Sequence, residues 1–484
     1  MVQLANSAPI ALKFLFKRLK WPVPMVRWRA AKEIRNLLNT DVTRQAATEQ
    51  LLASLEGCLC ESEVCALLSI IFMTSVVARP PQAAVIEKIK HPSLLSDMLL
   101  ERTYGKGMGG WIHPYAGEAP WDFESGTYFE THCTAHVPPI LKSNLRRLER
   151  TSGAPLLQQW AFEWKTLCDH LGTRLTQYPH YFGDTMETRS GIMGQFWQCM
   201  REVYVSAYLR TLAHAVSEWG LPQRIAEGYC LDIVDGVAGM FEIEPGARPT
   251  WLSDIPERFC APDADFGAIA RELVEASQKD GMVAVSIDTP ISASVQRFAR
   301  LQITTHLITA DYEIPEGEYL YEKMQLFVIE RTFDLRGAPP SITLDEVSSV
   351  GSKGGDEAAV CSCLFPIPFG GWQGHIFGLG LAIPAPYVIT NTEISCTAEG
   401  INMMSRDQEI LSTTRVWNDG WVPTHPKSSS TRCGFVTMLD VSCLEQATIR
   451  LDRQLALFVR LRTWDREEEY GEYEEMERNQ LIVL

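Results

Sequence analysis

Apolar residues in the first hundred positions recur at three- and four-residue steps, which is the spacing of one helical face. In the segment 23–38 this face consists of Val26, Ala30, Ile34, Leu37 and Leu38. Further segments of helical length follow at 44–55, 62–77, 81–89 and 92–102. We therefore expect residues 1–102 to form short helices, each about the length of one member of a helical hairpin.

Beyond about residue 240 the pattern changes from the period of helices to the period of strands. Leu455, Leu457 and Val459 alternate with the residues between them, as expected for a half-buried strand over 454–462. Other segments that fit strands are 282–287, 300–310, 318–332, 358–365, 376–390, 412–417 and 434–441. The predicted fold class is α+β, with an α-helical N-terminal half followed by a mostly antiparallel β-rich domain, a sandwich or an open barrel.

Residues 103–139 are rich in glycine, proline and aromatic side chains. Because so many aromatic residues argue against disorder, we expect an ordered segment laid across a neighbouring surface. Helices resume at Ile140, and the clearest helical patterns cover 155–177 and 190–219. The predicted domains are 1–102 (helical repeats), 103–240 (aromatic-rich connection and helical domain), 241–464 (β-rich domain) and 465–484 (acidic tail).

The charge of the chain limits its partners. With 44 Lys and Arg against 60 Asp and Glu in 484 residues, the net charge is −16 at pH 7. Such a chain repels phosphate backbones, so nucleic acid is not expected as the main partner. The acidic run 465–478 is expected to be a solvated extension. A weaker alternative is nucleic-acid binding by the locally basic N-terminus, which contains Lys13, Lys17, Arg18, Lys20, Arg27, Arg29, Lys32 and Arg35.

Cysteine usage and hydropathy predict a cytoplasmic protein without a membrane partner. The thirteen cysteines are scattered, and no secretory signal is recognised. The longest apolar run, Val64–Val77, spans 14 residues, which suits a buried core helix rather than a membrane span. The pairs Cys58 and Cys60, and Cys361 and Cys363, lack the spacing of redox or zinc motifs and are interpreted as core thiols.

No pattern predicts a catalytic residue, a metal site or a cofactor. His132 and His136 lie four residues apart, but the glutamate of a zinc-protease motif is replaced by Cys133. Cys168 and His170 would diverge on a helix. The segment 350–355 places its lysine before the glycine pair and is followed by two carboxylates, unlike a phosphate-binding loop.

Two aromatic loops form the candidate binding site. Five glycines in 369–380 surround Trp372 and His375, and a second loop contains Trp417, Trp421 and His425. If both loops meet at one end of the β domain, they form an aromatic recognition surface. The alternative is that the glycines serve turns and the aromatic residues pack in the core.

Two stretches resemble known families. The segment VRWRAAKEIRNLL (26–38), and less closely ESEVCALLSIIF (61–72), resembles the second helix of HEAT-type repeats, which implies a stacked helical scaffold. The segment EVYVSAYLRTLAHAVSEW (202–219) resembles regions of bacterial NACHT- or STAND-class defence proteins outside their nucleotide-binding module. That resemblance implies a sensor, scaffold or accessory subunit of a defence system.

The resulting functional hypothesis is a non-enzymatic scaffold or recognition protein that binds another protein. It rests on the repeat pattern, on thirteen tryptophans and on the missing catalytic signatures. The alternative is a hydrolase with a Cys/His site between the helical and β halves. Its candidate residues are His132, Cys133, His136 and His375.

Overall fold

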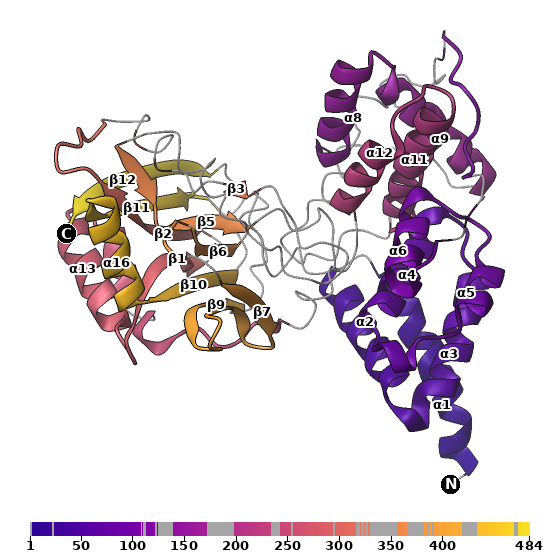
Figure 1. Ribbon diagram of the computed structural model, residues 1–484, viewed down its shortest axis with the longest axis horizontal. Coiled ribbons are helices and arrows are strands. Elements are labelled where there is room, and N and C mark those ends of the chain that lie inside the picture. The colour runs from indigo at the N-terminus through magenta and orange to yellow at the C-terminus, as the bar shows by residue number, and fades with distance from the viewer. Residues whose placement is uncertain are drawn as a thin grey trace. The chain divides into compact units, whose positions relative to one another are not determined.

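The structure is a computed structural model of the chain (Figure 1). The described residues are 2–21, 24–107, 109, 113–121, 123, 139–171, 198–233, 243–252, 255–293, 296–315, 320, 324, 328–329, 356–364, 381–385, 387–389, 392–418, 433–468 and 473–484. They divide into a helical unit up to residue 233 and a sheet unit from residue 243, each treated separately below.

The helical unit contains α-helices and short 3-10 segments (Figure 1). Its elements are α1 (Val2–Lys17), η1 (Arg18–Lys20), α2 (Pro24–Asn39), α3 (Asp41–Glu56), α4 (Glu61–Met73), η2 (Val76–Ala78), α5 (Gln82–Lys88), α6 (Leu94–Tyr104), α8 (Pro139–Ser152), α9 (Leu156–Leu171), α11 (Gln198–Ser217), α12 (Gln223–Cys230) and η5 (Leu231–Ile233). The helices expected before residue 102 are confirmed, with ends that shift by a few residues.

Helix α4 is the centre of this unit because it is apolar on every side. Its buried apolar residues include Val64, Leu67, Leu68, Ile70 and Ile71. It packs against α2, α6 and α11. The prediction of a buried core helix in the longest apolar run is thus confirmed for 64–73, whereas Val76 and Val77 at the end of the run are exposed on η2. The boundary expected at 102/103 falls inside one unit.

Helices α9 and α11 are held together by stacked aromatic rings. Trp160 and Trp164 lie one turn apart on α9, and their centroids are 5.5 and 5.8 Å from the ring of Tyr204 on α11. Burial of rings of this size is a large source of stability, and the stacked geometry adds to it. This cluster packs one side of α11 against α9, and the polar residues described below lie on another side of the same helix.

The sheet unit is a long antiparallel sheet with helices and a small second sheet. Its elements are η7 (Thr250–Leu252), η8 (Ile255–Cys260), α13 (Phe266–Ser277), β1 (Met282–Ala293), β2 (Arg297–Ile308), β3 (Val328–Ile329), β4 (Glu357–Ala359), β5 (Cys361–Leu364), β6 (Leu381–Pro384), β7 (Glu393–Thr397), β8 (Gly400–Met404), β9 (Ile410–Asn418), β10 (Cys433–Asp440), α16 (Val441–Leu451), β11 (Gln454–Asp465) and β12 (Glu474–Val483). The main order is β12-β11-β2-β1-β10-β9-β8-β7, with β4 paired to β2, and the small sheet is β3-β5-β6.

One face of the long sheet is covered by α13, η7 and η8. Phe259, Phe266 and Leu273 pack there against apolar residues of β1, β2 and β11. Asp265 begins α13 because its side chain accepts a hydrogen bond from the Ala268 N–H. The mostly antiparallel β domain is confirmed. Helices rather than a second large sheet cover this face, and the strand order among the described residues is open.

Buried charged and polar groups on β1, β2 and β11 pair with one another. Asp288 Oδ1 lies 2.6 Å from Arg300 Nε in an ion pair, and Asp288 Oδ2 accepts a hydrogen bond from Gln302 Nε2 at 2.8 Å. Arg460 Nη2 lies 2.7 Å from Glu477 Oε2 on β12. Because each charge has a partner, these side chains can be buried without a large desolvation penalty.

The acidic tail expected at 465–484 is corrected by the structure, because β12 is the edge strand of the long sheet. It pairs with β11 from Ala456–Val483 to Asp465–Glu474. Glu475 and Glu477 form ion pairs with arginines of β11, while Leu481 and Ile482 are buried. The charge run was misleading because Glu475 and Glu477 have arginine partners on the neighbouring strand.

Candidate functional site

The aromatic residues proposed as a binding site are only partly described. Trp372, His375, Trp421 and His425 lie outside the described residues, as do His132, Cys133 and His136. Trp417 is fully buried in the core of the sheet unit, beneath α13 and its neighbours. This placement agrees with the alternative that aromatic residues of these loops pack in the core.

Cys58, Cys60 and Cys361, which belong to the two pairs interpreted as core thiols, are buried as predicted. Burial raises the pKa of the Cys58 and Cys168 thiols to about 12 and that of the Cys361 thiol further. A thiol acts as a nucleophile only as thiolate, so these three groups are inert at neutral pH. His170, two residues from Cys168, is exposed.

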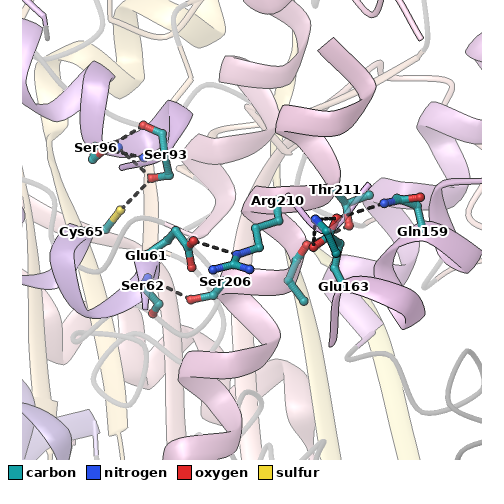
Figure 2. A network of polar contacts seen from close by, with 12 residues as sticks. Glu61, Ser62, Cys65, Ser93, Ser96, Gln159, Glu163, Ser206, Arg210 and Thr211 are labelled. Carbon is teal, nitrogen blue, oxygen red and sulfur yellow. Dashed lines mark hydrogen bonds and ion pairs between the residues drawn. The ribbon is translucent and has the colours of Figure 1, made fainter. Parts of the chain in front are cut away.

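A polar network crosses the interior of the helical unit between α4 and α11 (Figure 2). Glu61, in the first turn of α4, is 1% exposed, and its Oε1 lies 2.8 Å from Arg210 Nε on α11. The N-terminus of a helix favours a carboxylate. The guanidinium and the helix end therefore stabilise the same buried charge.

One turn along α11, the same interface contains a second set of contacts. The Ser62 N–H donates to Ser206 Oγ at 3.0 Å, and the Ser62 hydroxyl donates to Glu202. Glu202 also lies 3.6 Å from Arg27 of α2. Arg27, one of the basic residues of 23–38, is therefore a buried ion-pair partner that is 2% exposed.

One feature of the sequence indicates this network, although it does not identify the partners. Glu202, Ser206, Arg210 and His214 follow one another at four-residue steps, so they form one polar stripe on an otherwise apolar helix. A polar stripe among apolar residues marks a buried polar contact. Its partners could not be found, because Glu61 and Arg210 are 149 residues apart.

A third part of the network fastens the segment 113–121, here called the strap, to α9. The Ala116 N–H donates to both oxygens of Glu163, at 2.8 and 3.0 Å, and Gln159 Nε2 donates to Glu163 Oε1 at 3.0 Å (Figure 2). Gln159 also bonds the backbone of Gly117 and Ala119. Burial raises the pKa of Glu163 from 4.5 to about 7.

The strap is also attached to α6 and α11. His113 Nε2 lies 2.9 Å from Asp97 Oδ2, and the Tyr115 hydroxyl donates to Glu218 at 2.5 Å. The Tyr115 ring meets the buried His214 ring edge-on, with centroids 5.1 Å apart. Desolvation lowers the pKa of His214. The expectation of an ordered segment across a neighbouring surface is therefore confirmed for 113–121.

The serines of this network bond to helix ends and to neighbouring helices. Ser62 donates to the Glu202 carboxylate, Ser206 accepts from a backbone N–H, and Ser93 and Ser96 form a capping box at the start of α6.

The outer side of the helical unit contains two pockets, one on each side of α1. The first, called the α1 groove, has a volume of ≈770 Å³ and lies between α1, α2 and α3. Its apolar lining includes Phe14, Leu15, Leu37, Ala46, Ala47 and Ala53. The three alanines belong to α3, and their short side chains leave room for the groove. Phe14, beside it, is 61% exposed. Arg18, Glu33 and Glu49 line it as well.

The second pocket, called the lysine pocket, has a volume of ≈270 Å³ and lies between α1, η1, α3 and α4. Lys13, Lys17 and Lys20 line it from successive turns of one helical face. Its apolar lining includes Phe16, Leu19 and Leu67. Three residues of the predicted basic N-terminus thus surround a pocket, whereas Arg27 points into the core.

Comparisons with known proteins add no family to this description. No protein-family model and no curated protein matches the sequence.

Within the described ranges, every helix is too short or too polar to span a lipid bilayer. Within the same ranges, no three His, Cys, Asp or Glu side chains are grouped as a metal site requires.

Proposed function

We propose that this chain is a non-enzymatic, cytoplasmic recognition protein that binds another protein through the α1 groove. The observation that carries the proposal is the apolar lining of the groove, which includes the exposed ring of Phe14; Ile10, one turn earlier on α1, is exposed as well. Large apolar side chains beside a groove between helices are typical of sites that accept the apolar face of an amphipathic helix.

The charges around the groove define the partner further. Glu33 and Glu49 line it against one cation, Arg18, and the whole chain has a net charge of −16. Complementary charges speed the encounter with the correct partner and weaken the binding of proteins with like charges. We therefore assign to the groove an amphipathic helix of another protein, with lysine or arginine residues flanking its apolar stripe.

Site-specific photocrosslinking tests this proposal. In one variant of this chain, the photoreactive residue benzoylphenylalanine replaces Phe14. In the control variant it replaces Val77, which is 86% exposed on η2 outside the groove. After irradiation in source cells, mass spectrometry identifies the crosslinked peptide. We expect the variant at position 14 to be crosslinked to one other protein, through an apolar helical segment of that protein with basic residues on both sides. The variant at position 77 should give no such product.

Substitutions test whether the crosslinked protein depends on the groove. Ala46→Glu places a charge on the groove wall, and we expect it to weaken co-purification of that partner at least tenfold. Val42→Glu, at a side chain 93% exposed on the same helix, is the control and should change nothing. A crosslink only to a second copy, no crosslink at all, or equal effects of both variants would contradict the proposal.

The other hypotheses stay predictions. The hydrolase alternative depends on residues outside the described ranges, and no described contact favours it. A role as accessory or sensor subunit of a bacterial defence system rests on the resemblance of 202–219 alone. Plating efficiency of a phage panel on cells with and without the gene would test that role directly.

A further inference from the structure

We propose that the lysine pocket binds a small amphiphile that has an apolar body and a single anionic headgroup. The pocket is separate from the α1 groove, and its occupation does not depend on the partner proposed above. Its chemistry combines an apolar interior with cations at one side, which is the arrangement that such a molecule requires.

The apolar interior comes from three elements. Phe16 and Leu19 of α1 and η1 are 6% and 8% exposed, and Leu67 of α4 is 5% exposed. Gly57, at the end of α3, lines the same space without a side chain. An alkyl chain placed there would remove apolar surface from water on both molecules, which favours binding.

The lysines supply the charge that such a headgroup needs. Lys20 is already paired with Glu63, as its raised pKa also reflects. In the described part of the chain, no ion pair or hydrogen bond engages the ammonium groups of Lys13 and Lys17. An anion between these two lysines would gain charge-assisted hydrogen bonds from flexible side chains that reach the mouth of the pocket.

The carboxylates in the pocket do not oppose an anion at this position. Glu63 accepts from Lys20 and from the Leu59 N–H at 2.9 Å. Glu202 accepts from Ser62 and lies beside Arg27. The Cys58 thiol is neutral because burial raises its pKa to about 12. The two acidic groups are therefore compensated by the protein itself, while two lysines are left for the ligand.

Isothermal titration with three ten-carbon probes tests the site: decanoate, decyl phosphate and 1-decanol. We expect saturable one-to-one binding of at least one anionic probe and binding at least tenfold weaker for decanol. The anionic probe that binds more tightly assigns the headgroup as carboxylate or phosphate. Equal binding of decanol, or no saturable binding of either anion, overturns the proposal.

Variants locate the binding. Lys13→Ala and Lys17→Ala should each weaken binding of the anionic probe about tenfold, whereas Lys90→Ala, at an exposed lysine outside the pocket, should leave it unchanged. Ala66→Phe fills the pocket and should abolish binding of all probes. Circular dichroism confirms that each variant is folded. Unchanged affinity in folded Lys13→Ala and Lys17→Ala, or full binding by folded Ala66→Phe, refutes the assignment.

Discussion

The buried carboxyl group of Glu163 makes the stability of the helical unit depend on pH. Its side chain is fully buried, and burial raises its pKa from 4.5 to about 7. The folded state thus holds the Glu163 proton more tightly than the unfolded state does. The contribution is fully present below pH 4.5 and is lost as the pH rises through about 7.

The size of the effect follows from the two pKa values. A rise from 4.5 to about 7 corresponds to about 3 kcal/mol of stability. Most of it, about 2.5 kcal/mol, is lost between pH 5 and pH 8. Glu163→Gln keeps the shape of the protonated side chain and an oxygen that can accept from the Ala116 N–H, but it does not titrate. We therefore expect this variant to be more stable than the wild type at pH 8 and similar to it at pH 5.

Urea denaturation at both pH values, followed by circular dichroism at the helical band, measures the free energy of unfolding. Other groups titrate in this range, so the quantity of interest is the difference between the wild type and Glu163→Gln. Glu101→Gln, at an exposed glutamate of α6, is the matched control and should follow the wild type. The same pH dependence in wild type and Glu163→Gln, or a variant that is less stable at pH 8, would refute the reasoning.

Three further predictions concern charge, packing and backbone freedom. Arg210→Met should destabilise the helical unit by about 3–5 kcal/mol, because it leaves Glu61 buried without its partner, whereas the double variant with Glu61→Leu should recover most of that loss in a double-mutant cycle. Gly434→Ala should destabilise the sheet unit by at least about 1–3 kcal/mol in thermal denaturation, since a Cβ there would lie 2.5 Å from the Trp417 ring. Gly228→Ala, in a helix with open space around the new carbon, should instead stabilise by about 0.5–1 kcal/mol.

The sequence predicted those helices and strands whose structure follows from the local spacing of apolar residues. The apolar spacing of 23–38 and the run at 64–77 identified α2 and α4, and alternation identified β11. The hairpin of β7 and β8 was missed because each strand has only five residues, so its alternation of apolar and polar side chains is short. The strand β12 was missed because its acidic residues were judged without their arginine partners.

The polar network could not be predicted in the same way. The pairs Arg27–Glu202 and Glu61–Arg210 join residues that are more than a hundred positions apart, so no local pattern specifies them. The pockets beside α1 depend on how three helices pack. The basic residues were visible in the sequence, but their division between a pocket wall and the buried core follows from the tertiary fold.

The pairing of β2 with β11 has a consequence for how the sheet unit is made. These neighbours pair along twelve positions, from Arg297–Asp465 to Ile308–Gln454, although well over a hundred residues separate them in the chain. Closing so long a loop before any contact is gained slows folding. The sheet unit should therefore refold in a slow phase after the helices have formed. During that phase its strands are unpaired, and chaperones that bind exposed strands would act on it then.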